Sequence, residues 1–203
     1  MKLKWIIALC ALLSLTIVGC GDSEDVAESQ RTDIVRFLTS SHNPRLVSIE
    51  DIGSSLQAQP PFYECIENIV YRYIATYYDS DRITRKEIRE GDQVTLTYTA
   101  YIFTGSTPTA NNVYATNDVL TLEQLRMAGL NSQYWSVDPL MVKIGGGDII
   151  KGLELSLIGC REGDVVEAYI TSGGAYGKNV VGIVPEKTPV VWFYTVESVG
   201  AAQ

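Results

Sequence analysis

Histidine is nearly absent from this chain: His42 is the only one among 203 residues. A Ser-His-Asp triad or a histidine-rich metal site needs imidazole groups beside other reactive side chains. His42 stands in the N-terminal part of the chain, where we expect it to lie outside the strands of the folded domain. Both kinds of site are therefore excluded, and we expect no metal and no other cofactor.

Positive charge is also scarce. Lysine and arginine together number 16 against 24 aspartate and glutamate residues, which gives a net charge of −8. The sequence contains no basic stripe that would neutralise phosphate groups, so nucleic acid is excluded as a partner.

The glycine-rich segments lack the patterns of nucleotide-binding loops. After Gly145 and Gly147, Ile150 stands where a dinucleotide-binding fingerprint needs its third glycine. Residues 172–178 misplace the first glycine of a phosphate loop, and Asn179 replaces its Ser or Thr. We interpret these glycines as turn residues with positive φ at the start of a helix.

The N-terminus has the pattern of a bacterial export signal. Lys2 and Lys4 precede an apolar run over residues 5–18, which is short for a membrane-spanning helix, and Gly19-Cys20 follows it. This ending resembles a lipobox and predicts a signal peptide over residues 1–19 and lipidation of Cys20. We therefore expect a lipid-anchored protein of the bacterial cell envelope, on a membrane face that the sequence does not determine. The alternative is an ordinary cleaved signal in which Cys20 is incidental.

Few cysteines remain after removal of that signal. The processed chain has 184 residues, with 14 basic residues against 24 acidic ones, and its cysteines besides Cys20 are Cys65 and Cys160. An oxidising envelope allows these two to form a disulfide. Alternatively, Cys160 is a small buried thiol at the end of an apolar helix.

Residues 20–61 are expected to be a tether, a helix and a linker. The helix covers residues 24–40, and loop-forming Ser, Asn, Gly and Pro dominate residues 41–61. A loose apolar stripe on the helix predicts packing against the domain, and a dimerising helix is the alternative. We expect a monomer. The stripe consists of Ala27, Ile34, Val35, Phe37 and Leu38.

Strand patterns dominate the rest of the chain, which we assign to one domain over residues 62–200. Residues 67–78 are rich in β-branched and aromatic side chains, and residues 94–102 alternate between apolar and Thr or Tyr positions. Further strands are expected at 140–144, 164–171 and 189–199. A short helix over 149–158 is expected to be capped by Asp148, with Glu154 solvated. The predicted fold class is α+β, an antiparallel sheet wrapped around a short α-helix, with an N-terminal helical extension.

A series of short motifs follows in a distinctive order. These are Glu90-Gly91-Asp92, Val113-Tyr114-Ala115-Thr116, the segment 145–152, Glu162-Gly163-Asp164, Ala175-Tyr176-Gly177 and Ile183-Val184-Pro185. In order and spacing they resemble the FKBP-type peptidyl-prolyl cis-trans isomerases over residues 90–199, with an insert at 117–139. The resemblance implies an FKBP-like fold and an apolar pocket for proline. We interpret the insert as a lid, a partner surface, a plug or simple packing.

The same resemblance assigns the residues of the site. It implies Tyr98, Tyr176 and Trp192 as catalytic residues, with Tyr176 donating a hydrogen bond to a substrate carbonyl. Ala115 departs from the pattern, because many active members carry aspartate there, and Leu153 replaces a common tryptophan. The expected substrate-binding residues are Tyr114, Leu140, Ile149, Ile150, Leu153 and Ile183.

The expected function is isomerisation of X-Pro bonds in exported proteins, with proline-containing polypeptides as partners. Rotation about a peptide bond has a barrier of about 18–20 kcal/mol. An apolar pocket removes water from the planar amide, and its shape favours the twisted bond. The alternative function is a non-catalytic lipoprotein whose FKBP-like pocket binds a peptide or an envelope partner.

Overall fold

The structure is a computed structural model that describes residues 21–131 and 135–200. The predicted signal peptide and the lipidation site Cys20 lie outside the described residues. Within the described ranges, no helix combines the length and apolar character needed to cross a membrane.

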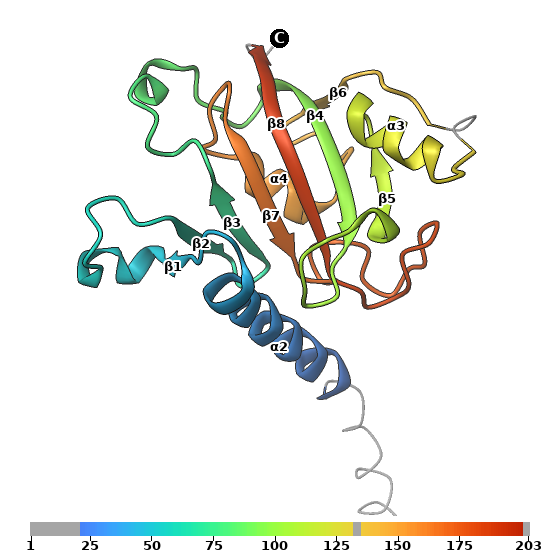
Figure 1. The fold of residues 1–203 in the computed structure, drawn as a ribbon, viewed down its shortest axis with the longest axis horizontal. Coiled ribbons are helices and arrows are strands. Elements are labelled where there is room, and N and C mark those ends of the chain that lie inside the picture. Colours follow the sequence, from blue (N-terminus) through green and yellow to red (C-terminus); the bar gives the residue numbers. More distant parts are fainter. Residues whose placement is uncertain (1–20, 132–134, 201–203) are drawn as a thin grey trace, which may run out of the picture.

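An eight-stranded sheet forms the centre of the fold, in the order β1-β2-β3-β7-β8-β4-β5, with β6 also pairing with β4 (Figure 1). All pairs are antiparallel except β1 with β2. The predicted α+β fold is confirmed. The strands are β1 (Val47–Ser48), β2 (Phe62–Ile66), β3 (Val70–Ile74), β4 (Gln93–Ile102), β5 (Val113–Thr116), β6 (Leu140–Lys143), β7 (Val165–Ile170) and β8 (Val190–Gly200).

The main core lies between one face of the sheet and the short helix α4 (Lys151–Leu157). The helix buries Leu153 and Leu157 there, while the alternation predicted for residues 94–102 places Val94, Leu96 and Ala100 in the same core. This alternation follows from the two-residue repeat of a strand with one face buried.

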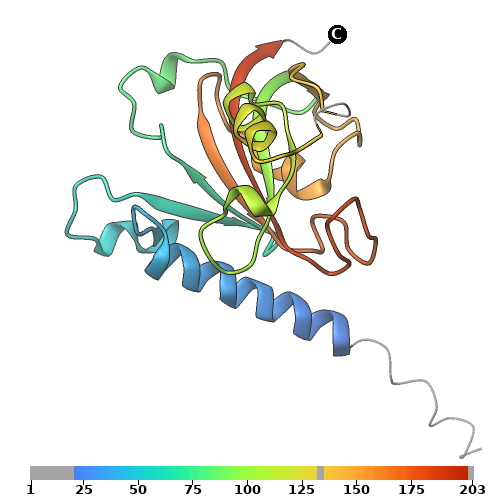
Figure 2. The ribbon, with the colours of Figure 1, turned by 45° about the vertical axis from the view of Figure 1, so that its right-hand side comes forward.

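The N-terminal helix α2 (Gly21–Arg36) continues into a π-helical turn, Phe37–Ser41, and covers part of the opposite face (Figure 2). Ile34, Phe37 and Leu38 are buried against Tyr169 and Val191 of the sheet. The prediction that this stripe packs on the domain is therefore confirmed. The expectation of a monomer stays a prediction.

The predicted strand over residues 67–78 is wrong in its bounds. A tight turn joins β2 to β3, and both Glu67 (φ 51°) and Asn68 (φ 55°) in it are left-handed. Asn tolerates this conformation, which suits the right-handed twist of a hairpin. Strand β3 therefore begins at Val70 and ends at Ile74.

His42 lies in a bend outside the strands, as expected, but its side chain contacts the sheet. It is buried, and its Nε2 lies 2.9 Å from a carboxylate oxygen of Glu167 on β7. The side chain thus attaches the segment after α2 to the sheet. The predicted linker that follows is mainly loop, but it includes the short strand β1 and a 3-10 turn, Ile49–Ser54.

The predicted cap of the central helix is also wrong. Helix α4 begins at Lys151 with Ile150 as its N-cap residue, and no side chain caps it. The Gly152 N–H, in the first turn of the helix, instead donates to the Gly174 carbonyl at 2.8 Å. Glu154 is not simply solvated, because its carboxylate accepts a hydrogen bond from the Gly145 N–H.

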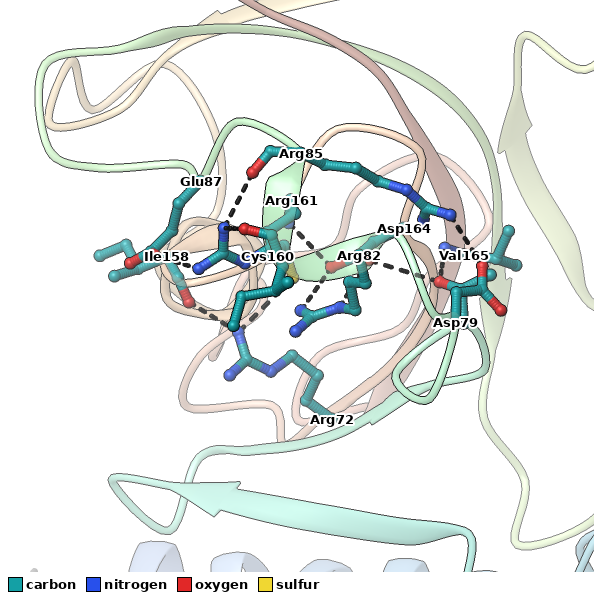
Figure 3. A network of polar contacts seen from close by, with 12 residues as sticks. Arg72, Asp79, Arg82, Arg85, Glu87, Ile158, Cys160, Arg161, Asp164 and Val165 are labelled. Carbon is teal, nitrogen blue, oxygen red and sulfur yellow. Dashed lines mark hydrogen bonds and ion pairs between the residues drawn. The ribbon is translucent and has the colours of Figure 1, made fainter. Parts of the chain in front are cut away.

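A network of arginine contacts connects β3 and the segment after it to the end of α4 and to the turn before β7 (Figure 3). Arg72 of β3 is buried and donates to the carbonyls of Ser156 and Ile158, at 2.9 and 2.7 Å, at the end of α4. A cation suits this end of a helix, where carbonyls lack partners. Cys160 is buried beside Arg72; both Cys160 and Cys65 are free thiols, so the possible disulfide between them is absent.

Candidate functional site

Two short strands share one edge of β4 and border the candidate site. Thr116 of β5 pairs with Thr99, and Leu140 of β6 pairs with Leu96. The chain leaves this edge at the end of β5 and returns at the start of β6. Residues 117–139 therefore lie beside the gap, and they include helix α3 (Val119–Met127).

Asn117 fills that gap with its side chain. Its buried amide donates to the carbonyls of Leu96 (2.9 Å) and Asp138 (3.1 Å) and accepts from the Tyr98 N–H (2.7 Å). Asn117 is not among the site residues predicted from the sequence. A polar residue directly after a strand was the available signal, but it does not reveal which backbone groups the side chain reaches.

An aromatic group lies beside this edge. Tyr98 of β4 and Trp192 of β8 are stacked, with ring centroids 4.6 Å apart and an interplanar angle of 22°. The Trp192 Nε1–H donates to the Tyr114 hydroxyl at 2.8 Å. Trp192 of β8 pairs with Ala100 of β4, which lies two residues from Tyr98 on the same face of the sheet. Tyr98 and Trp192 are therefore diagonal neighbours.

Tyr176 reaches the same group from the loop after β7. Its hydroxyl donates to the Tyr114 hydroxyl at 3.4 Å, and the two rings meet edge to face. The close approach of Gly174 to Gly152 holds the loop against α4, since their backbones form the hydrogen bond described above. The structure thus brings together Tyr98, Tyr114, Tyr176 and Trp192.

A cleft of about 430 Å³ opens in front of Tyr98 and Tyr114. Residues of the predicted insert, Trp135, Ser136 and Asp138, form part of its wall. Its other lining residues are Ala115, Thr116, Asn117 and Leu140. The cleft therefore combines a largely aromatic and aliphatic wall from β4, β5 and β6, which also includes Thr116, with a rim from residues 117–139.

The remaining predicted site residues differ in accessibility. Ile149, Ile150 and Tyr176 are partly buried against the core. Leu153 is 0 % exposed and Trp192 is 6 % exposed, so both support the wall from behind.

Ile183 lies apart from this group and is 60 % exposed. Its neighbour Val184 is the fully buried residue of that motif, because a tight turn pairs Val181 with Val184. The role of Ile183 as a substrate-binding residue stays a prediction.

The tyrosines of the wall are protonated groups in an apolar setting. Burial raises the pKa of Tyr114, and the neighbouring Tyr176 raises it further. Burial also raises the pKa of Tyr98. Both phenols therefore remain hydrogen-bond donors at neutral pH. Among the residues that the structure describes, no group of three or more His, Cys, Asp or Glu side chains is arranged to hold a metal ion.

Comparison with known proteins identifies one family. The family model described as FKBP-type peptidyl-prolyl cis-trans isomerase matches residues 84–197, more than half of the chain. No curated protein matches. Among solved structures, the three FKBP domains of wheat FKBP73 match at 18% identity and a TM-score of 0.46, over 66% of this chain and 47% of that chain. This chain thus spans about half the length of the three-domain wheat chain.

Proposed function

Since the chain belongs to the FKBP-type peptidyl-prolyl cis-trans isomerase family, we propose that its domain isomerises X-Pro bonds in the cleft beside Tyr98 and Tyr114. The observation that carries this proposal is the convergence of four aromatic side chains, from β4, β5, β8 and the 172–177 loop, two of which, Tyr98 and Tyr114, line the cleft.

The geometry suits a reaction that needs no covalent intermediate. The apolar wall removes water from the planar amide, whose polar resonance form water stabilises, and favours the less polar twisted bond. Each tenfold acceleration requires about 1.4 kcal/mol of preferential binding to the twisted state. The hydroxyls of the wall supply fixed donors for a substrate carbonyl.

An isomerisation assay on a proline-containing peptide tests this function. We expect the full chain to accelerate the cis-trans exchange, and a macrolide ligand of this family to inhibit it. Ile150→Ala opens the wall and should lower the rate, whereas Ile158→Ala, an exposed position just after α4, is the matched control. No acceleration by the wild-type chain would rule out the catalytic proposal.

We further propose that the protein acts in the bacterial cell envelope on exported proteins, anchored by lipid on Cys20. The basic residues, the short apolar run and the Gly19-Cys20 ending support this placement. Metabolic labelling with a radioactive fatty acid tests it. The wild-type chain should carry label in the membrane fraction, and Cys20→Ser should abolish both label and membrane retention.

A non-catalytic peptide-binding role is the second candidate. Ala115 lacks the carboxylate that many active relatives carry, and insert residues form part of the cleft wall. Tight binding of a proline-containing peptide without any acceleration of its isomerisation would favour this role over catalysis.

A further inference from the structure

Two hydrogen-bond donors point at the same atom in the aromatic wall. The Trp192 Nε1–H and the Tyr176 hydroxyl both donate to the hydroxyl oxygen of Tyr114, at 2.8 and 3.4 Å. A tyrosine hydroxyl both accepts hydrogen bonds and donates one hydrogen. Because the Tyr114 oxygen already accepts from two donors, its own hydrogen is the group that this trio offers to a further acceptor.

Of the three side chains in this trio, Tyr114 is the one that lines the cleft. Trp192 is almost fully buried behind it and stacks on Tyr98. The next residue, Ala115, also lines the cleft but has no polar side chain. The Tyr114 hydroxyl therefore supplies a polar group beside Ala115, where this chain has no polar side chain of its own.

We propose that Tyr114 donates the hydrogen bond to a carbonyl oxygen of the bound proline-containing chain, the role that the family resemblance gives to Tyr176. Trp192 and Tyr176 are then positioning residues that hold the Tyr114 ring and hydroxyl. This inference rests on the proposed function, which supplies the substrate class.

Two physical effects support this assignment. Hydrogen bonds in a chain polarise one another, so the two bonds that Tyr114 accepts strengthen the one that it donates. Burial raises the pKa of Tyr114, which keeps its hydroxyl protonated at neutral pH.

The test measures isomerisation rate and peptide dissociation constant for the full chain and four variants. Tyr114→Phe removes only the hydroxyl and should lower kcat/KM by about two- to tenfold, the loss expected for one hydrogen bond. Tyr176→Phe should cause a smaller loss, and none in the Tyr114→Phe background. Tyr101→Phe, which changes a phenol against Phe193 on the opposite face of β4, is the matched control.

The indole N–H proton signal of Trp192 gives a second readout, assigned by its loss in Trp192→Phe. It should move upfield in Tyr114→Phe and stay in place in Tyr101→Phe. A wild-type chain that binds the peptide without turnover still supports the inference if Tyr114→Phe weakens binding. Equal rates and affinities in Tyr114→Phe and Tyr101→Phe, or fully additive losses in the double variant, would overturn it. A wild-type chain that neither binds nor turns over the peptide would overturn the proposed function, and this inference with it.

Discussion

Arg82 holds the fully buried carboxylate of Asp164 at two points, with Nε and Nη2 2.8 and 2.7 Å from its two oxygens. Arg82 lies just before the family match, and Asp164 ends the turn that precedes β7. Asp164 also accepts from the Arg161 N–H at 2.8 Å (Figure 3). The pair therefore connects the segment after β3 to a turn inside the family domain.

Asp164→Asn should destabilise the protein by about 3–5 kcal/mol, because it leaves the Arg82 guanidinium buried without its counter-charge. Urea unfolding measures the change. Asp79→Asn is the matched control: Asp79 pairs with Arg85 and its side chain is 44% exposed, so the loss should be about 0–1 kcal/mol. Equal losses in both variants would contradict a special role for the buried pair.

Gly152→Ala should destabilise the domain by about 1–3 kcal/mol through overpacking. A Cβ at Gly152 would lie 2.2 Å from Ile170 Cγ2, and one at Gly174 would lie 2.1 Å from Ile69 Cγ2. Thermal unfolding checks the expected loss for both substitutions. Gly173→Ala is the control next in the chain, since nothing lies within 4 Å of its added methyl group. A destabilised Gly173→Ala variant would show that the loop tolerates no side chain, whatever its contacts.

The His42–Glu167 contact should make stability depend on pH. Burial lowers the pKa of His42, but the hydrogen bonds to Glu167 and the Pro44 carbonyl, with the charge of Glu167, outweigh it, so the net pKa is raised. The hydroxyl of Tyr169 also donates to Glu167, and the Tyr73 ring packs on His42. A raised folded-state pKa means that this contribution is fully present below about pH 6.5, the usual histidine value, and is lost as pH rises through the folded pKa.

The measurement compares the free energy of unfolding of wild type and His42→Gln between pH 5 and 9 (a span of about four units around the usual histidine value). Their difference should shrink as pH rises. Glu167→Gln should remove most of this pH dependence because it removes the carboxylate partner. A difference that grows with pH would show that burial, and not Glu167, dominates at His42.

Asn117→Asp should destabilise the β4 edge by about 1–3 kcal/mol. The substitution keeps the shape but replaces the amide N–H₂, which donates to Leu96 and Asp138, by an oxygen. Hydrogen exchange at the amides of β6 and residues 135–138 should accelerate. Asn112→Asp, in an exposed turn before β5, is the control. Unchanged exchange in Asn117→Asp would mean that the strands alone hold this edge.

The sequence by itself determined the class of fold and the positions of most strands. The alternation over residues 94–102 predicts β4 because a strand with one buried face repeats every two residues. The motif order identified the family, which the match over residues 84–197 shows. These signals are local, so they can be recognised without knowing which segments meet.

Tertiary structure alone decided the details of the site. The motif Ile183-Val184-Pro185 does not reveal that Val184 turns inward while Ile183 is exposed, since the Val181–Val184 turn sets that direction. Likewise, Tyr114 and Trp192 are far apart in sequence, and only strand pairing brings their polar atoms within 2.8 Å. His42 and Asn117 lie outside the strands, and their polar side chains have partners on β7 and β4, respectively. Sequence patterns record burial and local conformation, whereas these hydrogen bonds depend on register between distant segments.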